Sequence, residues 1–114
     1  MRVVFILGTT SGGTGTHVRM LAAGLAARGI SVSVFGPSRT GGDLGFAALR
    51  GVEFAPVEFG DRPRAGDAVA VLRLRRLLGA GGVAVAHAHG LRAGALAVLA
   101  LAGVRGTGRR PALA

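Results

Sequence analysis

Hydrophobic residues along the chain fall into alternating strand-like and helix-like patterns. Residues 3–7 form an unbroken apolar run rich in β-branched side chains, and Gly8 ends it; such a run predicts a strand buried on both faces. After the glycine-rich stretch 8–15, apolar residues recur at helical spacing through residues 18–25. Gly29 closes this segment, as glycine commonly does just after a helix. The first part of the chain therefore predicts a strand, a glycine loop and a helix.

The same alternation continues to the end of the chain. Strands are predicted at residues 30–35, 52–55 and 83–87, and the first residues of a fifth at 111–114. Helical patterns cover residues 43–50, with Asp43 as the N-cap, then 67–78 and 91–102. Strands that alternate with helices predict right-handed crossovers and a parallel sheet. We therefore expect an α/β fold, a Rossmann-like parallel sheet with flanking helices and strand order 3-2-1-4, the fifth strand lying next to the fourth.

The 114 residues fit one small domain, without an internal repeat or boundary. The chain ends where the fifth strand begins, and a fourth strand with no partner would expose a row of backbone donors and acceptors. The helix at 91–102 is apolar nearly all round, which is typical of a helix that is covered on every side. We therefore expect residues 1–114 to be part of a longer protein.

Composition removes several classes of protein. Half of the residues are hydrophobic, which excludes a disordered tail, and the absence of cysteine excludes a disulfide scaffold, a cysteine metal site and a thiol nucleophile. The net charge is +9 and every cation is an arginine. Arg73, Arg75 and Arg76 are expected on the solvated face of their helix. No exposed aromatic platform or nucleic-acid motif accompanies the charge, so we expect no nucleic-acid partner.

No apolar stretch approaches the ~20 residues of a transmembrane helix. The five apolar residues near the N-terminus are also too few for the core of a signal peptide. We therefore expect a cytoplasmic protein, and the positive charge leaves open peripheral contact with the inner face of a membrane.

The glycine-rich stretch is the first candidate site. It follows the first strand and precedes a helix N-terminus, a position where unpaired N–H groups and the helix dipole favour phosphate. The candidate phosphate-binding residues are Gly12, Gly13, Thr14, Gly15 and Thr16. Their spacing is neither the G-x-G-x-x-G fingerprint nor a P-loop, which needs a lysine. A glycine turn required only for close packing of strand and helix remains the alternative.

The three histidines are the second candidate feature. His17 is expected in the first turn of the helix beside the glycine loop, and His87 and His89 on one side of the fourth strand's end. No carboxylate has ligand spacing with this pair, so we expect no metal. His87 is expected to be the more buried and structural. His89 is expected in the loop beside Gly90, and is the better candidate for polar contact with a ligand.

Several of these segments together resemble a known family. The run from Gly12 through Thr16 to His17 and Val18, the helix ending at Arg28-Gly29, and His87-Ala88-His89-Gly90 resemble the N-terminal domain of family 4 glycosyltransferases, which are retaining enzymes with the GT-B fold. The resemblance covers nearly the whole chain. Thr16 and Ile30 depart from it, because the family commonly has arginine and histidine there.

The resemblance implies a partial N-terminal, acceptor-side domain, with the donor-binding C-terminal domain absent from residues 1–114. Its substrates would be a nucleotide-sugar and a hydroxyl acceptor, with no cofactor and no metal. Gly12 to Thr16 would approach the donor phosphate, and His17, His89 and Gly90 would line the acceptor side of the cleft. The family's cleft histidine and glutamates would lie beyond Ala114, so we expect no catalytic residue in this chain and no sugar transfer by it alone.

Two other functions fit the residues. A nucleotide-binding Rossmann module of the NADP type would share the fold, and Arg39 after the second strand would suit a 2′-phosphate. A non-catalytic interaction domain would instead use the arginines as its binding surface.

Overall fold

The computed structural model of the chain describes residues 2–8, 13–60, 62–79, 83–102 and 112–113. Within them, five strands form one parallel sheet in the order β3-β2-β1-β4-β5. The strands are β1 (Arg2–Leu7), β2 (Ser31–Gly36), β3 (Val52–Pro56), β4 (Val83–His89) and β5 (Ala112–Leu113). The helices are α1 (Gly13–Ala27), α2 (Ser38–Leu44), α3 (Asp67–Gly79) and α4 (Leu91–Ala102), with a 3-10 turn, η1 (Phe46–Ala48). The predicted α/β fold and strand order are confirmed.

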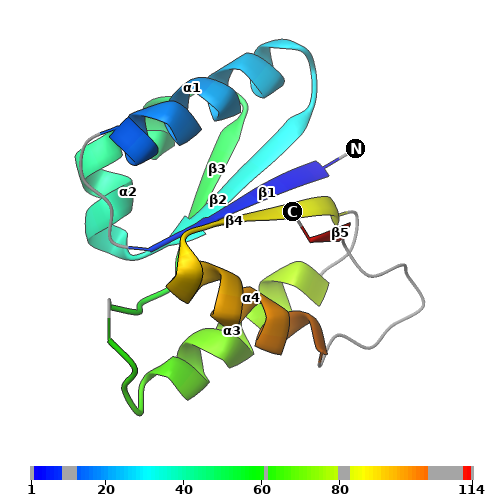
Figure 1. Ribbon diagram of the computed structural model, residues 1–114. Helices are drawn as coiled ribbons and strands as arrows, with labels where there is room; N and C mark the ends of the chain where they lie inside the picture. Colours follow the sequence, from blue (N-terminus) through cyan, green and yellow to red (C-terminus); the bar gives the residue numbers. More distant parts are fainter. Residues whose placement is uncertain (1, 9–12, 61, 80–82, 103–111, 114) are drawn as a thin grey trace.

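The helices cover the two faces of the sheet in separate layers. Helices α1 and α2 lie on one face and α3 and α4 on the other (Figure 1). This division follows from the strand order, because β2 and β3 are added on one side of β1 and β4 and β5 on the other. Right-handed connections that run in opposite directions across a sheet place their helices on opposite faces.

Strand β1 lies at the centre and supplies side chains to both layers. Val4 and Ile6 are fully buried in the cluster formed with α3 and α4. Phe5 and Leu7 are buried in the second cluster, which includes Val18 of α1. Full burial of such a side chain contributes roughly 1.5–3 kcal/mol relative to exposure. The prediction of a strand buried on both faces is thus confirmed.

The outer edge of β4 has a partner over two residues, because Val85 pairs with Ala112 and Ala86 with Leu113 of β5. This pairing confirms the predicted fifth strand, although β5 spans only two described residues. The last part of β4, including His87 and His89, pairs only with β1 within the described part of the chain.

Two helix boundaries differ from those the sequence predicts. Helix α1 begins at Gly13 rather than after the glycine-rich stretch, so this loop is shorter than expected. The predicted helix at 43–50 with Asp43 as N-cap is wrong, because Asp43 lies in the last turn of α2. Gly45 adopts a φ of +66° and ends α2 in the left-handed conformation that glycine tolerates.

Two of the three arginines of α3, Arg73 and Arg76, are exposed as the sequence predicts, and Arg75 is not. The guanidinium of Arg75 is half-buried and donates to the carbonyl oxygens of Leu99 and Ala100 near the end of α4. Arg73 donates to the carbonyl at the end of β3. Arg76 is exposed, as predicted. Two of these three cations therefore connect elements of the fold.

Glycine at position 41 is required by packing. A Cβ atom added there would overlap the ring of Phe54, which also stacks on Phe46 at 6.2 Å between ring centroids. We expect Gly41→Ala to lower the free energy of unfolding by about 1–3 kcal/mol, because the aromatic pair must shift. The measurement is urea unfolding followed by circular dichroism.

The neighbouring Gly42 is the matched control. It lies in the same helix and is exposed, and a Cβ atom added there would meet nothing within 4 Å. Gly42→Ala should leave stability unchanged or raise it by up to about 1 kcal/mol through helix propensity. Equal effects of the two substitutions would show that Phe54 does not restrict position 41.

Candidate functional site

The segments that follow the strands meet at one end of the sheet, which we call the carboxyl edge: Gly8 after β1, Pro37 after β2, Val57 after β3 and Gly90 after β4. In open parallel sheets, ligands bind at this edge, next to the point where strand order reverses. Here the reversal lies between β1 and β4, because the chain is built outward from β1 to β3 on one side and then from β4 to β5 on the other. Both candidate features of the sequence therefore belong to this edge.

A first set of contacts joins the loops after β1, β2 and β3. The hydroxyl of Thr40 in α2 donates to the carbonyl oxygen of Gly8 at 3.2 Å. The carboxylate of Glu58 accepts from the backbone N–H of Ser38 at 2.7 Å and from the Ser38 hydroxyl at 3.0 Å. Glu58 thus caps the N-terminus of α2 from the next loop along the chain, which explains why α2 begins there and not at Asp43.

A second set of contacts holds the loop before α3 against the start of α4. Arg92, in the first turn of α4, forms a salt bridge with Asp67 at 2.9 Å between Nη2 and Oδ2. The same guanidinium donates to the carbonyl oxygens of Gly60 at 3.1 Å and Arg62 at 3.2 Å. The Arg92 hydrogen bond, aided by the backbone N–H of Arg64, holds the pKa of Asp67 below its usual range. Arg92 therefore holds the loop before α3 and the start of α4 together.

A small cavity opens beside these contacts. Its volume is about 280 Å³ and it is lined by Glu58, Phe59, Gly60, Arg64, Gly66 and Asp67. Gly8 adjoins it, since a Cβ there would lie 3.3 Å from the ring of Phe59. The cavity thus lies at the carboxyl edge, between the two sets of contacts.

The histidines of β4 lie side by side on the α1 face of the sheet. The strand runs through His89 rather than ending at His87, because Leu7 and His89 continue the pairing with β1. The prediction that His89 lies in a loop is therefore wrong. The His87 and His89 ring centroids are 4.3 Å apart, and each lies about 6 Å from the ring of Phe5.

Burial affects His89 in particular. Both His87 and His89 are half-buried, so His87 does not stand out as the more buried of the two, contrary to the sequence-based expectation. The Nε2 atom of His89 is shut off from solvent and has no hydrogen-bond partner among the described residues. Burial lowers the pKa of His89, and the charges of His87 and His17 lower it further. A neutral imidazole is therefore favoured at this position.

The predicted phosphate-binding residues divide into two groups. Gly12 lies outside the described residues. Gly13 to Thr16 form the first turn of α1, with Gly15 buried and Thr16 exposed. His17 follows in the same helix and is exposed. Gly90 has a φ of +93°, which L residues with a side chain rarely adopt. The start of α1 and the turn at Gly90 thus both lie at the carboxyl edge.

Sequence reasoning missed three residues that build this edge: Thr40, Glu58 and Arg92. Arg92 carried one local signal, because a cation in the first turn of a helix opposes the helix dipole and needs a compensating partner. Glu58 and Thr40 carried none. Their partners lie 20 and 32 residues away in the sequence and meet them only through the fold.

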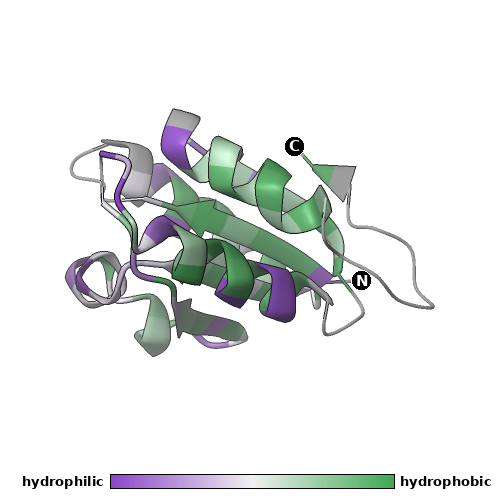
Figure 2. Ribbon diagram, turned by 90° about the horizontal axis from the view of Figure 1, so that it is seen from below, coloured by the Kyte–Doolittle hydropathy of each residue, from purple (hydrophilic) through white to green (hydrophobic). Residues whose placement is uncertain are grey.

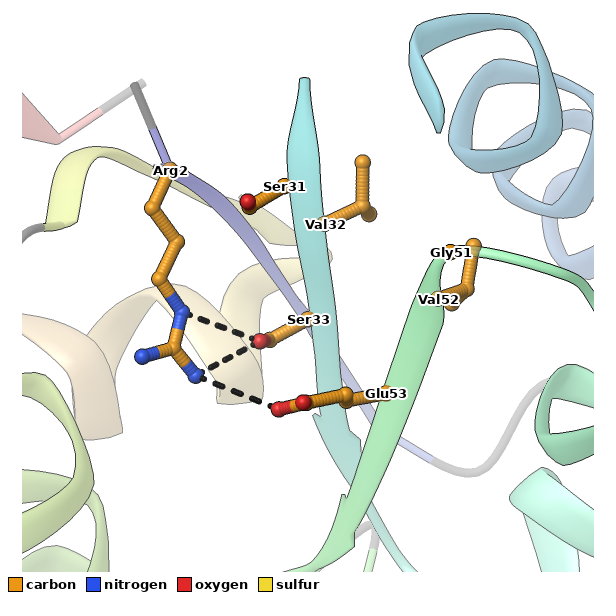
Figure 3. Close-up of a pocket in the computed structure, with 7 residues that line it drawn as sticks. All are labelled: Arg2, Ser31, Val32, Ser33, Gly51, Val52 and Glu53. Atoms are coloured by element: carbon orange, nitrogen blue, oxygen red, sulfur yellow. Dashed lines mark hydrogen bonds and ion pairs between the residues drawn. The ribbon is translucent and has the colours of Figure 1, made fainter. Parts of the chain in front are cut away.

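A second cavity, of about 510 Å³, lies at the opposite end of the sheet (Figure 3). The guanidinium of Arg2 donates to the Ser33 hydroxyl at 2.7 and 3.1 Å and lies 3.7 Å from the Glu53 carboxylate. The side chains of Arg2, Ser33 and Glu53 thus bind one another. This cavity contains none of the candidate site residues.

The described ranges show neither a metal cluster nor a membrane helix. No three histidine or acidic side chains within them come together in a way that could hold a metal ion. No helix in this part of the chain has both the length and the apolar character needed to cross a membrane.

The chain matches a known protein family over nearly its whole length. The family described as Glycosyltransferase Family 4 matches residues 11–113, from the glycine-rich stretch to the last described residue of β5. No curated protein and no solved structure matches the chain. The matched range contains every helix and every strand of the described structure except β1.

The lowered pKa of His89 predicts a pH-dependent stability. Below its ordinary value of 6.5, the unfolded chain takes up a proton that folded His89 resists. The free energy of unfolding should therefore fall as the pH drops from about 6.5 toward the lowered pKa, and this contribution should be constant above 6.5. Urea unfolding over a series of pH values measures it.

Substitution separates His89 from the other histidines. His89→Gln should flatten the pH dependence in this window, while His17→Gln, on the exposed side of α1, should leave most of it. The same slope in the wild type and in His89→Gln would contradict the assignment.

The contacts of Arg92 predict a graded loss of stability. Arg92→Ala removes every bond to Asp67, Gly60 and Arg62, whereas Arg92→Lys keeps the charge but loses the planar fork of donors. We expect the melting temperature to fall most in the alanine variant and less in the lysine variant. Backbone hydrogen exchange near Gly60 should accelerate in the same order.

Arg76→Ala is the control, because Arg76 is an exposed arginine of α3. Its melting temperature should stay close to that of the wild type. If Arg92→Ala melted at the same temperature as Arg76→Ala, Arg92 would not hold the two loops together.

Proposed function

The chain belongs to glycosyltransferase family 4, and we propose that it is the acceptor-side part of an enzyme that transfers a sugar from a nucleotide-sugar to a hydroxyl acceptor with retention. The family match over residues 11–113 is the observation that carries this proposal. The convergence of the loops at the carboxyl edge supports it, because ligands of such sheets bind there.

The start of α1 is the proposed contact for the donor phosphate, through Gly12, Gly13, Thr14, Gly15 and Thr16. Helix α1 begins at Gly13, so the unpaired N–H groups of its first turn and the positive end of its dipole lie at this edge. Glycines allow a phosphate to approach the backbone closely. Both properties suit a diphosphate and need no lysine.

His17, His89 and Gly90 are the proposed acceptor side. His17 is exposed, so its imidazole is accessible to a hydroxyl group and can form a hydrogen bond with it. His89 packs against Phe5 and His87, and its lowered pKa favours a neutral ring. Gly90 supplies the turn that ends β4 and starts α4.

Transfer itself is proposed to require a second, donor-binding domain. The chain is proposed to supply binding surfaces and no catalytic residue, with the nucleotide-sugar as a substrate and no cofactor or metal. We propose that it acts in the cytoplasm, and that residues 1–114 alone do not transfer sugar.

An NADP-type function is less well supported by the geometry. Such a cofactor would place its ribose or 2′-phosphate beside the residues after β2. The N-terminus of α2, which lies there, is already capped by the negative charge of Glu58. The Arg39 side chain is 89% exposed and lies 3.9 Å from Asp43. A phosphate at this position would meet an anion at the helix N-terminus.

The proposal predicts activity when this chain is joined to a donor-binding domain of the same polypeptide. Such a protein should release nucleoside diphosphate from one member of a panel of nucleotide-sugars in the presence of hydroxyl acceptors. Nuclear magnetic resonance of the product should show the anomeric configuration of the donor. His17→Ala should lower kcat/KM roughly tenfold, the effect of losing about 1.4 kcal/mol of transition-state binding.

Met20→Ala is the control, because Met20 is an exposed residue of the same helix with no proposed contact to substrate. Its kcat/KM should equal that of the wild type. Tight binding of NADPH with no diphosphate release would replace the proposal with the NADP-type function. Inversion of the anomeric centre would overturn the retaining chemistry alone.

A further inference from the structure

The cavity of about 280 Å³ beside the loop after β3 is preformed, because contacts on two sides fix the loop. Arg92 is the only charged residue of α4, and Figure 2 shows hydrophobic colouring along most of that helix. Its guanidinium donates to the Gly60 carbonyl oxygen in this loop and to Asp67 at the start of α3. Phe59 anchors the loop from the other side, since its side chain is buried in the core. A ligand would therefore meet a cavity whose walls are already in place.

Two carboxylates line the cavity, and both keep acceptor positions for a ligand. A carboxylate offers about four lone-pair positions. Among the described residues, Glu58 accepts two hydrogen bonds, both from Ser38. Asp67 accepts from the guanidinium of Arg92 and from the backbone N–H of Arg64. These bonds hold the two carboxylates in place and leave positions to which a hydroxyl group can donate.

Arg64 provides hydrogen-bond donors to the same cavity. Its side chain is exposed, and its charge acts on Asp67. A guanidinium carries several N–H donors and no acceptor, so it suits the oxygen of a hydroxyl group. Donors and acceptors are therefore combined within one small cavity.

The charges of the lining favour a neutral ligand over an ion. An anion would be repelled by Glu58 and Asp67, and a cation would be repelled by Arg64. A hydroxyl group both donates and accepts, so a molecule with several neighbouring hydroxyl groups satisfies both kinds of lining group at once. Phe59 and two glycines complete the lining, and the carbon atoms of such a molecule would pack against them. A polyol is therefore the class of ligand that this lining fits.

The position of the cavity links it to the proposed acceptor side. Arg92, which holds the wall of the cavity, closely follows Gly90 in the sequence. We propose that the cavity binds a neutral polyol, such as one sugar ring, as a part of the hydroxyl acceptor. Only the identification of this polyol as the acceptor rests on the proposed function, because the binding of a polyol is argued from the lining itself.

Nuclear magnetic resonance of the 114-residue chain tests the binding directly. Glucose, mannose and galactose are each titrated into 15N-labelled protein, with inorganic phosphate as the ionic comparison. At least one sugar should shift the backbone amide signals of Phe59, Gly60 and Gly66 in a saturable way. The dissociation constant should be roughly 1–20 mM, as expected for a ligand of this size. Phosphate should leave these three signals in place.

Two arginines of the same loop provide the variant and its matched control. Arg64 lines the cavity, whereas Arg62 is equally exposed and does not line it. Arg64→Gln should raise the dissociation constant of the sugar roughly fivefold, because it removes donors to the hydroxyl oxygens. Arg62→Gln removes the same charge and should leave the constant unchanged.

Three results would overturn the proposal. One is the absence of a saturable shift at the cavity with every sugar, and another is a shift with phosphate alone, which would identify an anion site. The third is equal weakening by the two substitutions, since the loss would then follow net charge and not the cavity. The titration needs neither a nucleotide-sugar nor a second domain. A failed transfer assay would therefore count against the proposed reaction, and a failed titration only against this cavity.

Discussion

The arrangement of helices and strands follows from β1, a central strand whose two faces must both be buried. Val4 and Ile6 of β1 are sealed by one cluster and Phe5 and Leu7 by the other. A parallel sheet meets that requirement only with a helical layer on each side. The position of α1 and α2 on one face, and of α3 and α4 on the other, follows from it. So does the meeting of four loops at the carboxyl edge, because parallel strands all end at the same side.

Two sets of contacts hold the loops at the carboxyl edge, and each set involves a different helical layer. Thr40 and Glu58 join the loops after β1, β2 and β3 to the α2 layer. Arg92 joins the loop before α3 to the start of α4. The histidines of β4 lie on the α1 face, beyond the strands that α1 and α2 cover. The groups at the carboxyl edge are therefore fixed by both layers and come from separate segments of the chain.

The sequence predicted what depends on local pattern. The apolar run of β1, the helical spacing in α1 and the glycine after it depend on neighbouring residues, and all reappear in the structure. The strand order followed because the handedness of crossovers leaves few alternatives. His89 was misplaced because the end of β4 is set by the length of β1, with which it pairs. Asp43 was misassigned because α2 is capped by Glu58, and a contact across 20 residues leaves no trace in local pattern.

The arginines have a use that their number alone does not reveal. Arg19, Arg73, Arg75 and Arg92 each donate to a backbone carbonyl oxygen of another segment. A carbonyl is neutral, so dissolved ions screen these bonds far less than they screen pairs of full charges. With fourteen arginines against five acidic residues, repulsion between cations is the larger charge effect. Rising ionic strength therefore weakens the repulsion between the cations more than it weakens these arginine–carbonyl hydrogen bonds.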